Sequence, residues 1–310
     1  MGGLMGDGSF FHLRCCAHIL NLVVGDGLKQ NELSISSVRN AVRFVRSSAP
    51  RSAKFKECIE FAKIGCKKLL CLDVQTRWNS AYLMLEAAEK FQVAFEKLEG
   101  EDSSYLDYFG EAGPPSVRDW EDVRCFVKFL KNFYDATKEF SSSQEVSLHK
   151  AFHQLAAVHC ELNRTTRNFN TVLASMSFDM KQKYDKYWGK IENINKLLYF
   201  GVILDPRFKL SYVEWCFNDM YGNQPTFFTN LIVVIHTQLF KLFNWYKDAH
   251  NQKHFGQPST SPSEAISVSE NVVSTEVPSH LARAEAYKKH LKKQSSTIKK
   301  NELEMSLKSI

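Results

Sequence analysis

Cysteine, histidine and lysine side chains occur at spacings that could do chemistry in two parts of this sequence. In the first part, Cys15 and His18 lie three positions apart, which would suit half of a zinc site. No second pair of ligands completes such a site, and the sequence contains no Cys-x-x-Cys segment. We therefore expect no bound metal. A buried cysteine with a hydrogen-bonded histidine is the structural alternative for this pair.

The second part is a basic stretch near the C-terminal end of the sequence, with almost no compensating acid. Clustered lysines can neutralise a phosphate backbone or act as a nuclear localisation signal. A solvated helix is the structural alternative, and the sequence leaves these readings open. The stretch contains Arg283, Lys288, Lys289, Lys292, Lys293, Lys299 and Lys300.

Other arrangements that would indicate catalysis or cofactor binding are missing from the sequence. His149, His153 and His159 have near-helical spacing, but no carboxylate or thiol is arranged with them as a ligand set. We therefore expect these histidines at the surface or satisfied in the core. No glycine-rich loop follows a strand, and no Ser-His-Asp arrangement can be defended, so we expect no cofactor.

The composition is typical of a folded, soluble protein. The 310 residues are 44% hydrophobic and 13% aromatic, which excludes wholesale disorder. A net charge of +6 is compatible with a nucleic-acid partner without requiring one. The eight cysteines are scattered, which predicts reduced thiols in the nucleus or cytosol. The longest apolar stretches are too short to span a membrane, and the first residues do not resemble a signal peptide.

The spacing of apolar residues predicts a mainly α-helical chain. The clearest helix runs from Ser116 to Phe140, and Thr76 is the expected N-cap of an earlier one. Acidic residues gather at Glu96–Asp122, where Gly113-Pro114-Pro115 stops regular structure, so a loop is predicted there. The remaining predicted elements are a strand at Phe10–Leu13 and helices at Cys16–Leu28, Asn31–Lys63 with a break near Pro50, a stretch after Thr76 that buries Tyr82, Leu85, Phe91 and Phe95, Leu148–Asn163, Asp179–Ile191, Tyr212–Tyr221 and Phe228–Lys247.

Four blocks in order resemble the hAT transposase-like proteins of plants, including the RICESLEEPER group. They are FFHLRCCAHILNLVV at Phe10–Val24, LDVQTRWNSAYLMLEAA at Leu72–Ala88, LYFGVILDPRFKL at Leu198–Leu210 and AEAYKKHLKK at Ala284–Lys293. The resemblance covers nearly the whole sequence. It implies an internal fragment of mainly α fold: the helical insertion domain of an hAT transposase, with a small remnant of the ribonuclease-H-like α/β core.

This mapping predicts four parts along the sequence. Residues 1–30 are the remnant of the ribonuclease-H-like core, and residues 31–248 are the helical insertion or transposase-like domain. Residues 249–279, rich in Ser, Pro, Asn and Gln, are a disordered linker. Residues 280–310 are a basic helical tail.

The resemblance also implies that this polypeptide does not cut DNA. The family uses two aspartates and a glutamate to hold the divalent metals that activate a hydroxide nucleophile. The aspartates lie upstream of the Cys-x-x-His block, and the glutamate belongs to a Ser-Glu-Arg block. No position here matches any of the three. Asp73 and Asp205 lie in matching blocks, but at positions that the family does not use as metal ligands.

The resemblance also implies which residues of this sequence contact DNA. Trp78 matches a tryptophan that stacks on a flipped base at the transposon end, an interaction of roughly 1–3 kcal/mol. Arg77 beside it can offset phosphate charge. The alternative is that Trp78 is only the first core residue of its helix. Cys15 and His18 resemble the family's pair beside the active site. The expected DNA-binding residues are Arg77, Trp78, Cys15, His18, Lys288, Lys289, Lys292 and Lys293.

Three hypotheses follow for the function. The leading one is a truncated or domesticated transposase-like nuclear protein that binds DNA weakly, non-specifically and in a salt-dependent way, without cutting it. The second is a helical interaction module that forms homo- or hetero-oligomers with related proteins. The third is a transposon relic without function, in which an unpaired edge at Phe10–Leu13 would be a folding liability.

Overall fold

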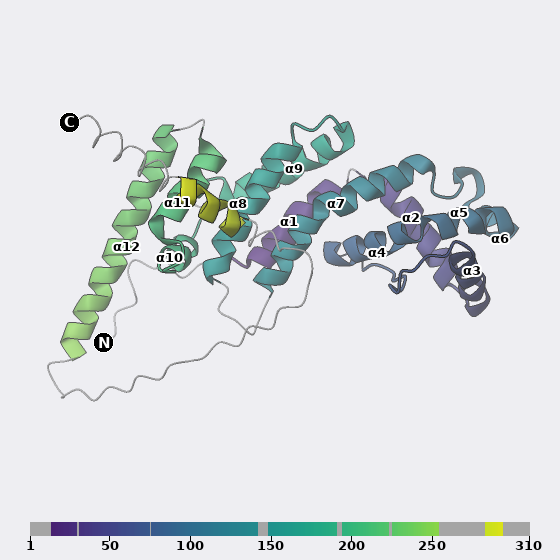
Figure 1. The fold of residues 1–310 in the computed structure, drawn as a ribbon, viewed down its shortest axis with the longest axis horizontal. Helices are drawn as coiled ribbons and strands as arrows, with labels where there is room; N and C mark the ends of the chain where they lie inside the picture. Colours follow the sequence, from purple (N-terminus) through teal and green to yellow (C-terminus); the bar gives the residue numbers. More distant parts are fainter. Residues whose placement is uncertain are drawn as a thin grey trace, which may run out of the picture. The chain divides into compact units, whose positions relative to one another are not determined.

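The computed structural model describes residues 14–29, 31–74, 76–141, 148–190, 194–222, 225–253 and 283–293. Every regular element in these ranges is a helix, which confirms the mainly α prediction (Figure 1). The predicted strand at Phe10–Leu13 lies outside them. The chain divides into two compact units. The N-terminal unit holds residues 14–141 and 158–190, and the C-terminal unit holds the described parts of residues 142–157 and 191–310.

The first helix of the N-terminal unit forms where its apolar stripe predicts it. Helix α1 (Cys16–Lys29) buries Ile19, Leu20, Val23 and Val24, and it packs along α9 (Thr171–Trp188). Gly27 lies at this contact, where a Cβ atom would come within 2.5 Å of the Met180 side chain. The Lys183 ammonium adds an ion pair of 2.8 Å to Asp26 across the two helices.

Helices α2 (Glu32–Arg46) and α3 (Ala49–Phe61) are separated close to Pro50, as predicted. Pro50 sits in the first turn of α3, where its missing N–H costs no helical hydrogen bond. The Ser48 hydroxyl caps this turn by accepting from the Arg51 N–H. The valine stripe of α2, including Val38 and Val42, is fully buried.

The predicted loop at Glu96–Asp122 is wrong, because most of these residues are helical. Helix α4 (Trp78–Lys90) is followed by α5 (Gln92–Glu101), α6 (Ser103–Phe109) and the short 3₁₀ helix η1 (Gly110–Ala112). The acidic residues lie on exposed faces, while Leu98 and Tyr105 are completely buried. A high acid content therefore obscured an amphipathic pattern.

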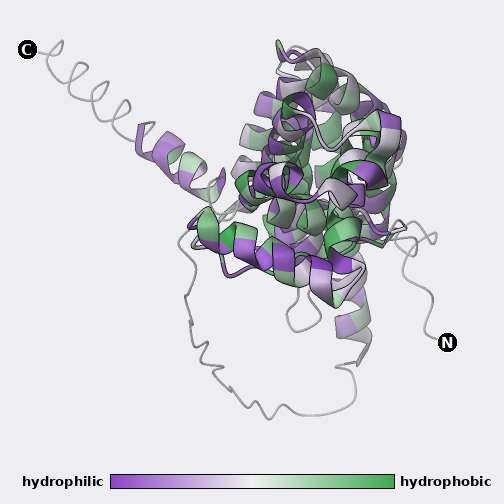
Figure 2. Cartoon of the chain, turned by 90° about the vertical axis from the view of Figure 1, so that its right-hand side faces the viewer, coloured by the Kyte–Doolittle hydropathy of each residue, from purple (hydrophilic) through white to green (hydrophobic). Residues whose placement is uncertain are grey.

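Helix α7 (Val117–Phe140) begins directly after the predicted Ser116. Ser116 and Asp119 form a capping box, in which each side chain accepts from the backbone N–H of the other residue. The helix buries Trp120, Phe126 and Phe133, and it packs against α1, α2 and α4. In amphipathic helices such as α7, the hydrophobic residues lie on the buried face and the hydrophilic residues on the exposed face (Figure 2).

The C-terminal unit contains α10 (Leu197–Ile203), α11 (Lys209–Tyr221), α12 (Pro225–Lys253), helical residues 283–293 and the first part of α8 (Leu148–Thr165). An aromatic cluster joins α8, α10 and α11: the Phe152 ring centroid lies 5.5 Å from that of Tyr199 and 5.7 Å from that of Phe217. Gly201 lets α10 approach Leu148 closely, since a Cβ there would lie 2.8 Å from the Leu148 side chain.

Several helix boundaries differ from the predictions. Helix α10 was not predicted, because seven residues are too short to show a clear period. Helix α9 begins at Thr171 rather than Asp179, and its N-cap is Asn170, whose side chain accepts from the Leu173 N–H. Helix α12 continues to Lys253, and residues 254–279 of the predicted linker lie outside the described residues. No described helix has the length and apolarity that crossing a membrane would require.

Candidate nucleic-acid interface

A buried ion pair holds the segment that leads into α4. The Arg39 Nε atom of α2 donates to both Asp73 carboxylate oxygens at 3.0 Å, and an Arg39 Nη atom pairs with the same group. The side chains of Arg39 and Asp73 are 8% and 3% exposed, and Glu32 is a second partner of the guanidinium. Burial acts to lower the pKa of Arg39, but the hydrogen bonds that it donates to Asp73 and Glu32 raise this pKa above its ordinary value.

The turn before α4 is closed by the Ser80 hydroxyl. This oxygen accepts from the Val74 N–H at 2.8 Å, and it lies within hydrogen-bonding distance of the Val74 and Arg77 carbonyl oxygens. Arg77 occupies the N-cap position without a side-chain cap, so the prediction of Thr76 as N-cap is wrong. A serine inside the helix therefore closes the turn that precedes it.

Arg77 and Trp78, which adjoin in the sequence, differ in their surroundings. Arg77 is exposed. Trp78 begins α4 and is 4% exposed, with its ring centroid 6.3 Å from that of Tyr82, which itself stacks on Tyr134 of α7. The Trp78 Nε1 atom is buried and has no hydrogen-bond partner among the described residues. Trp78 is thus a core residue, as the structural alternative expected, but one with an unused donor.

A cavity of about 200 Å³ lies beside Trp78 within the N-terminal unit. Charged groups of both signs line it together with apolar surface, so the cavity is close to electrically balanced. The Arg39 and Asp73 pair forms one wall and thereby connects the cavity to the segment before α4. Its lining residues are Asn21, Gly25, Leu28, Lys29, Glu32, Ile35, Arg39, Asp73, Thr76, Trp78 and Ala81.

The other predicted contact residues do not line this cavity. Cys15 and His18 are both exposed, one immediately before α1 and one in its first turn. Within the described parts of the chain, no group of three or more metal-binding side chains comes together. Lys288, Lys289, Lys292 and Lys293 are exposed in the C-terminal unit. The predicted residues therefore belong to two different units of the chain.

Sequence reasoning missed Arg39, Glu32 and Lys29 as residues of this site. Arg39 lies in the apolar stripe of α2, between Val38 and the fully buried Ala41. A charged residue on a buried helix face requires an oppositely charged or hydrogen-bonding partner, so the position of Arg39 in the sequence could have indicated a buried ion pair. The identity of that partner, Asp73, 34 positions away, could not be read from the spacing.

Comparison with known proteins finds two family models that match successive parts of the sequence. Residues 13–129 match the family model described as the ZBED1 RNase-like helical domain, and residues 149–246 match that of the hAT-like transposase, RNase-H fold. The chain is a homologue of the hAT-like transposases. The resemblance seen in the sequence blocks is thereby confirmed, and Leu72–Ala88 of this hAT-like chain forms the segment held by Arg39 and most of α4.

Relatives of the hAT-like chain include BED-domain zinc finger proteins of plants. RICESLEEPER 2 of Oryza sativa subsp. japonica is 34% identical over 77% of this chain and 32% of its own length. DAYSLEEPER of Arabidopsis thaliana is 31% identical over 54% of this chain and 23% of its own length. The chain thus spans about a third of RICESLEEPER 2. No solved structure matches it.

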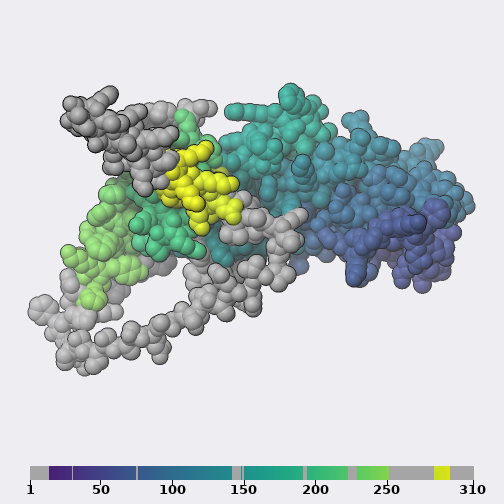
Figure 3. All heavy atoms as spheres, in the orientation of Figure 1, coloured from purple at the N-terminus to yellow at the C-terminus, as the bar shows by residue number. Residues whose placement is uncertain are grey.

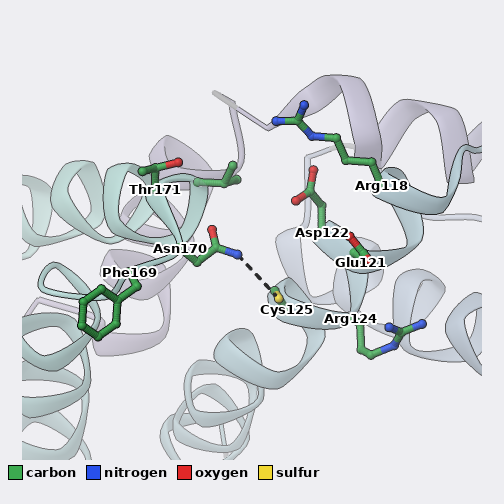
Figure 4. A pocket seen from close by; sticks show the side chains of 9 residues that line it. Arg118, Glu121, Asp122, Arg124, Cys125, Phe169, Asn170 and Thr171 are labelled. Atoms are coloured by element: carbon green, nitrogen blue, oxygen red, sulfur yellow. Dashed lines mark hydrogen bonds between the residues drawn. The ribbon is translucent and has the colours of Figure 1, made fainter.

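A second hollow of the hAT-like chain, about 600 Å³ and widely open, lies between the start of α7 and the start of α9 (Figure 4). Arg118 and Arg124 line it together with Glu121 and Asp122, so the hollow carries charges of both signs. The side chain of Asn170 reaches across to Cys125 Sγ at 3.8 Å. The mixed charge gives the hollow no preference for a phosphate, in contrast to a cationic groove.

Proposed function

We propose that this hAT-like chain binds DNA without cutting it, and that the cavity beside Trp78 receives an unstacked base. The observation that carries the proposal is the buried Trp78 Nε1 atom, which has no hydrogen-bond partner among the described residues and belongs to a side chain that lines the cavity. A buried N–H without an acceptor costs about 1–3 kcal/mol, and a bound base would supply the missing acceptor. Arg77, the residue before Trp78, is exposed and can contact the phosphate backbone of the bound DNA.

The contacts around the cavity support this proposal because they make the wall rigid. The Arg39 and Asp73 pair fixes the approach to α4, and Ser80 closes the turn that presents Arg77. A recognition site works best when such supporting contacts lock its side chains before the ligand arrives. The ordering cost of binding is then largely met during folding.

The absence of cutting is part of the same proposal. No position in this sequence matches the three carboxylates that the hAT resemblance would require for strand cleavage. We also propose that the protein acts in the nucleus, because its proposed partner is DNA and because it is related to transposase-like proteins. Binding through backbone charges and an unstacked base would be weak and salt-dependent, with little sequence preference.

Fluorescence anisotropy with two labelled duplexes tests the proposal. One duplex is fully paired and the other carries a single bulged base, which is already unstacked. We expect the bulged duplex to bind more tightly, and Trp78→Ala to remove that preference, since stacking on an aromatic ring contributes roughly 1–3 kcal/mol per base. Trp78→Phe keeps a ring but removes the N–H, and should retain part of the preference.

Trp188→Phe is the matched control, because Trp188 is also 4% exposed in the N-terminal unit but does not line the cavity. It should leave the preference for the bulged duplex unchanged. Circular dichroism must show that each variant is folded. Equal binding of both duplexes by the unmodified chain, or no binding at low salt, would remove the basis of the proposal.

A second candidate function, a helical interaction module, is favoured by one specific surface. The C-terminal half of α12 exposes large apolar side chains, including Phe240 at 53%, Phe243 at 61% and Tyr246 at 56%. Apolar side chains gathered on one helix are typical of a protein-binding face. Sedimentation equilibrium of the unmodified chain and of a Phe243→Ser variant distinguishes the two functions. A self-association that Phe243→Ser abolishes, in a chain that does not bind DNA, would favour the module.

A further inference from the structure

Helical residues 283–293 pack on α11 through an aromatic contact. Tyr287 is 2% exposed, and its ring centroid lies 5.0 Å from that of Tyr212 and 5.6 Å from that of Trp215. Its hydroxyl oxygen lies 2.7 Å from the Ser211 Oγ atom. A tyrosine that is buried in this way, with its polar end satisfied, anchors the segment to the C-terminal unit.

Arg283 adds a second anchor one turn earlier. It donates from an Nη atom to the Asp219 carboxylate at 2.9 Å, and its guanidinium carbon lies 5.3 Å from the ring centroid of Trp215. The Arg283 side chain is only 10% exposed. Trp215 therefore contacts both Arg283 and Tyr287, and the ring of His290 approaches it as well, at 6.1 Å. One face of the segment is fully used for docking.

The lysines occupy the other face. With a rotation of roughly 100° per residue, Lys288, Lys289, Lys292 and Lys293 fall within an arc of roughly 140° that does not include Tyr287. All four side chains are exposed. Lys288 and Lys289 form no ion pair with any described residue. Figure 3 shows the segment in yellow on the surface of the molecule.

We propose that the docked helix 283–293 is a phosphate-binding surface for nucleic acid, separate from the Trp78 cavity. It extends the proposed DNA binding to the C-terminal unit and rests on that function. Docking orders the backbone before binding, so the lysines lose less conformational entropy than they would on a free tail. Lysine ammonium groups act as point charges, so this surface contributes affinity without reading base sequence.

The arrangement favours a nucleic-acid backbone over an acidic protein surface. Lys288 and Lys292 are about one helical turn apart, and so are Lys289 and Lys293. Each pair forms a short row along the helix, with its two residues about 6 Å apart. Protein interfaces place aromatic or apolar anchors at their centre. Here the aromatic residues of the segment face α11, and the exposed arc carries the lysines and Glu285.

The test compares two double variants of the full chain in a salt series with labelled duplex DNA. Lys288→Gln with Lys289→Gln removes two charges from the proposed surface. Lys241→Gln with Lys247→Gln is the matched control, since both of these lysines are exposed on α12 in the same unit. We expect the first pair to lower the slope of log affinity against log salt by roughly 1.8, which corresponds to two phosphate contacts. The control should keep the original slope.

A second comparison tests the role of docking with all lysines intact. Tyr287→Ala should release the segment, which hydrogen exchange of residues 283–293 would report as lost protection, and should weaken DNA binding several-fold. Tyr287→Phe keeps the ring contacts with Tyr212 and Trp215, so it should remain close to the unmodified chain in both measurements. Unchanged DNA affinity of an undocked Tyr287→Ala chain would contradict the role of docking.

The outcomes separate this proposal from the function on which it rests. If both lysine pairs give the same slope while Trp78→Ala abolishes the preference for a bulged base, the docked helix is not a DNA contact, but the proposed function stands. If the unmodified chain binds no DNA at low salt, both fail. If the Lys288 and Lys289 changes weaken binding of polyglutamate but not of DNA, the surface belongs to an acidic protein partner and the proposal is overturned.

Discussion

Replacing Arg39 by glutamine would leave the Asp73 carboxylate buried without the guanidinium that neutralises it. The two side chains are 8% and 3% exposed, and the Arg39 Nε atom lies 3.0 Å from each Asp73 carboxylate oxygen. Breaking a buried pair by removing one partner costs about 3–5 kcal/mol, because an uncompensated charge remains in the interior. Glutamine can still donate one hydrogen bond, so we expect Arg39→Gln to cost about 3 kcal/mol.

Urea denaturation followed by circular dichroism measures this loss as a lower midpoint. The matched control is Arg164→Gln, since Arg164 bonds Glu161 at 2.6 Å but its side chain is 68% exposed, and exposed pairs contribute only about 0–1 kcal/mol. The double variant Arg39→Met with Asp73→Asn removes both charges and should recover most of the stability. If Arg39→Gln costs no more than Arg164→Gln, the reasoning about the buried pair is wrong.

Three further predictions concern single side chains of the N-terminal unit. Ser116→Ala removes half of the capping box with Asp119 and should lower the free energy of unfolding by about 1 kcal/mol in urea titrations. Tyr105→Phe should raise it by about 1 kcal/mol, because the fully buried Tyr105 hydroxyl has no hydrogen-bond partner among the described residues. Burial is the main cause, and the neighbouring Cys15 the smaller one, of a pKa of the Cys16 thiol that is raised from 9.0 to about 12. As the pH rises, the Cys16 thiol therefore loses its proton at a lower pH in the unfolded chain than in the folded chain, and the free energy of unfolding should fall between pH 9 and pH 12. Iodoacetamide at pH 9 should also label Cys16 faster in urea than in the folded chain, which peptide mass spectrometry would show.

Local patterns explain which helices the sequence predicts. The apolar stripe of α1 and the capping signal at Ser116 involve residues three or four positions apart, so one segment contains all the information needed. The acidic residues of α5 and α6 hid the same kind of pattern, because their helices depend on burying Leu98 and Tyr105 against the rest of the unit. Tertiary packing there outweighs a composition typical of loops.

The sequence alone determined the helical class and the family resemblance, and it singled out Trp78 and the lysine stretch as candidate contact residues. Only the tertiary structure decided that Trp78 is buried with an unused N–H, because its surroundings come from segments that are distant in the chain. It likewise decided that Tyr287 docks the lysine-bearing segment on α11, through a contact with Ser211 across 76 positions. Helical periodicity is encoded within a few residues. Burial, ion pairing and docking depend on which distant segments meet, and spacing along the chain does not specify those partners.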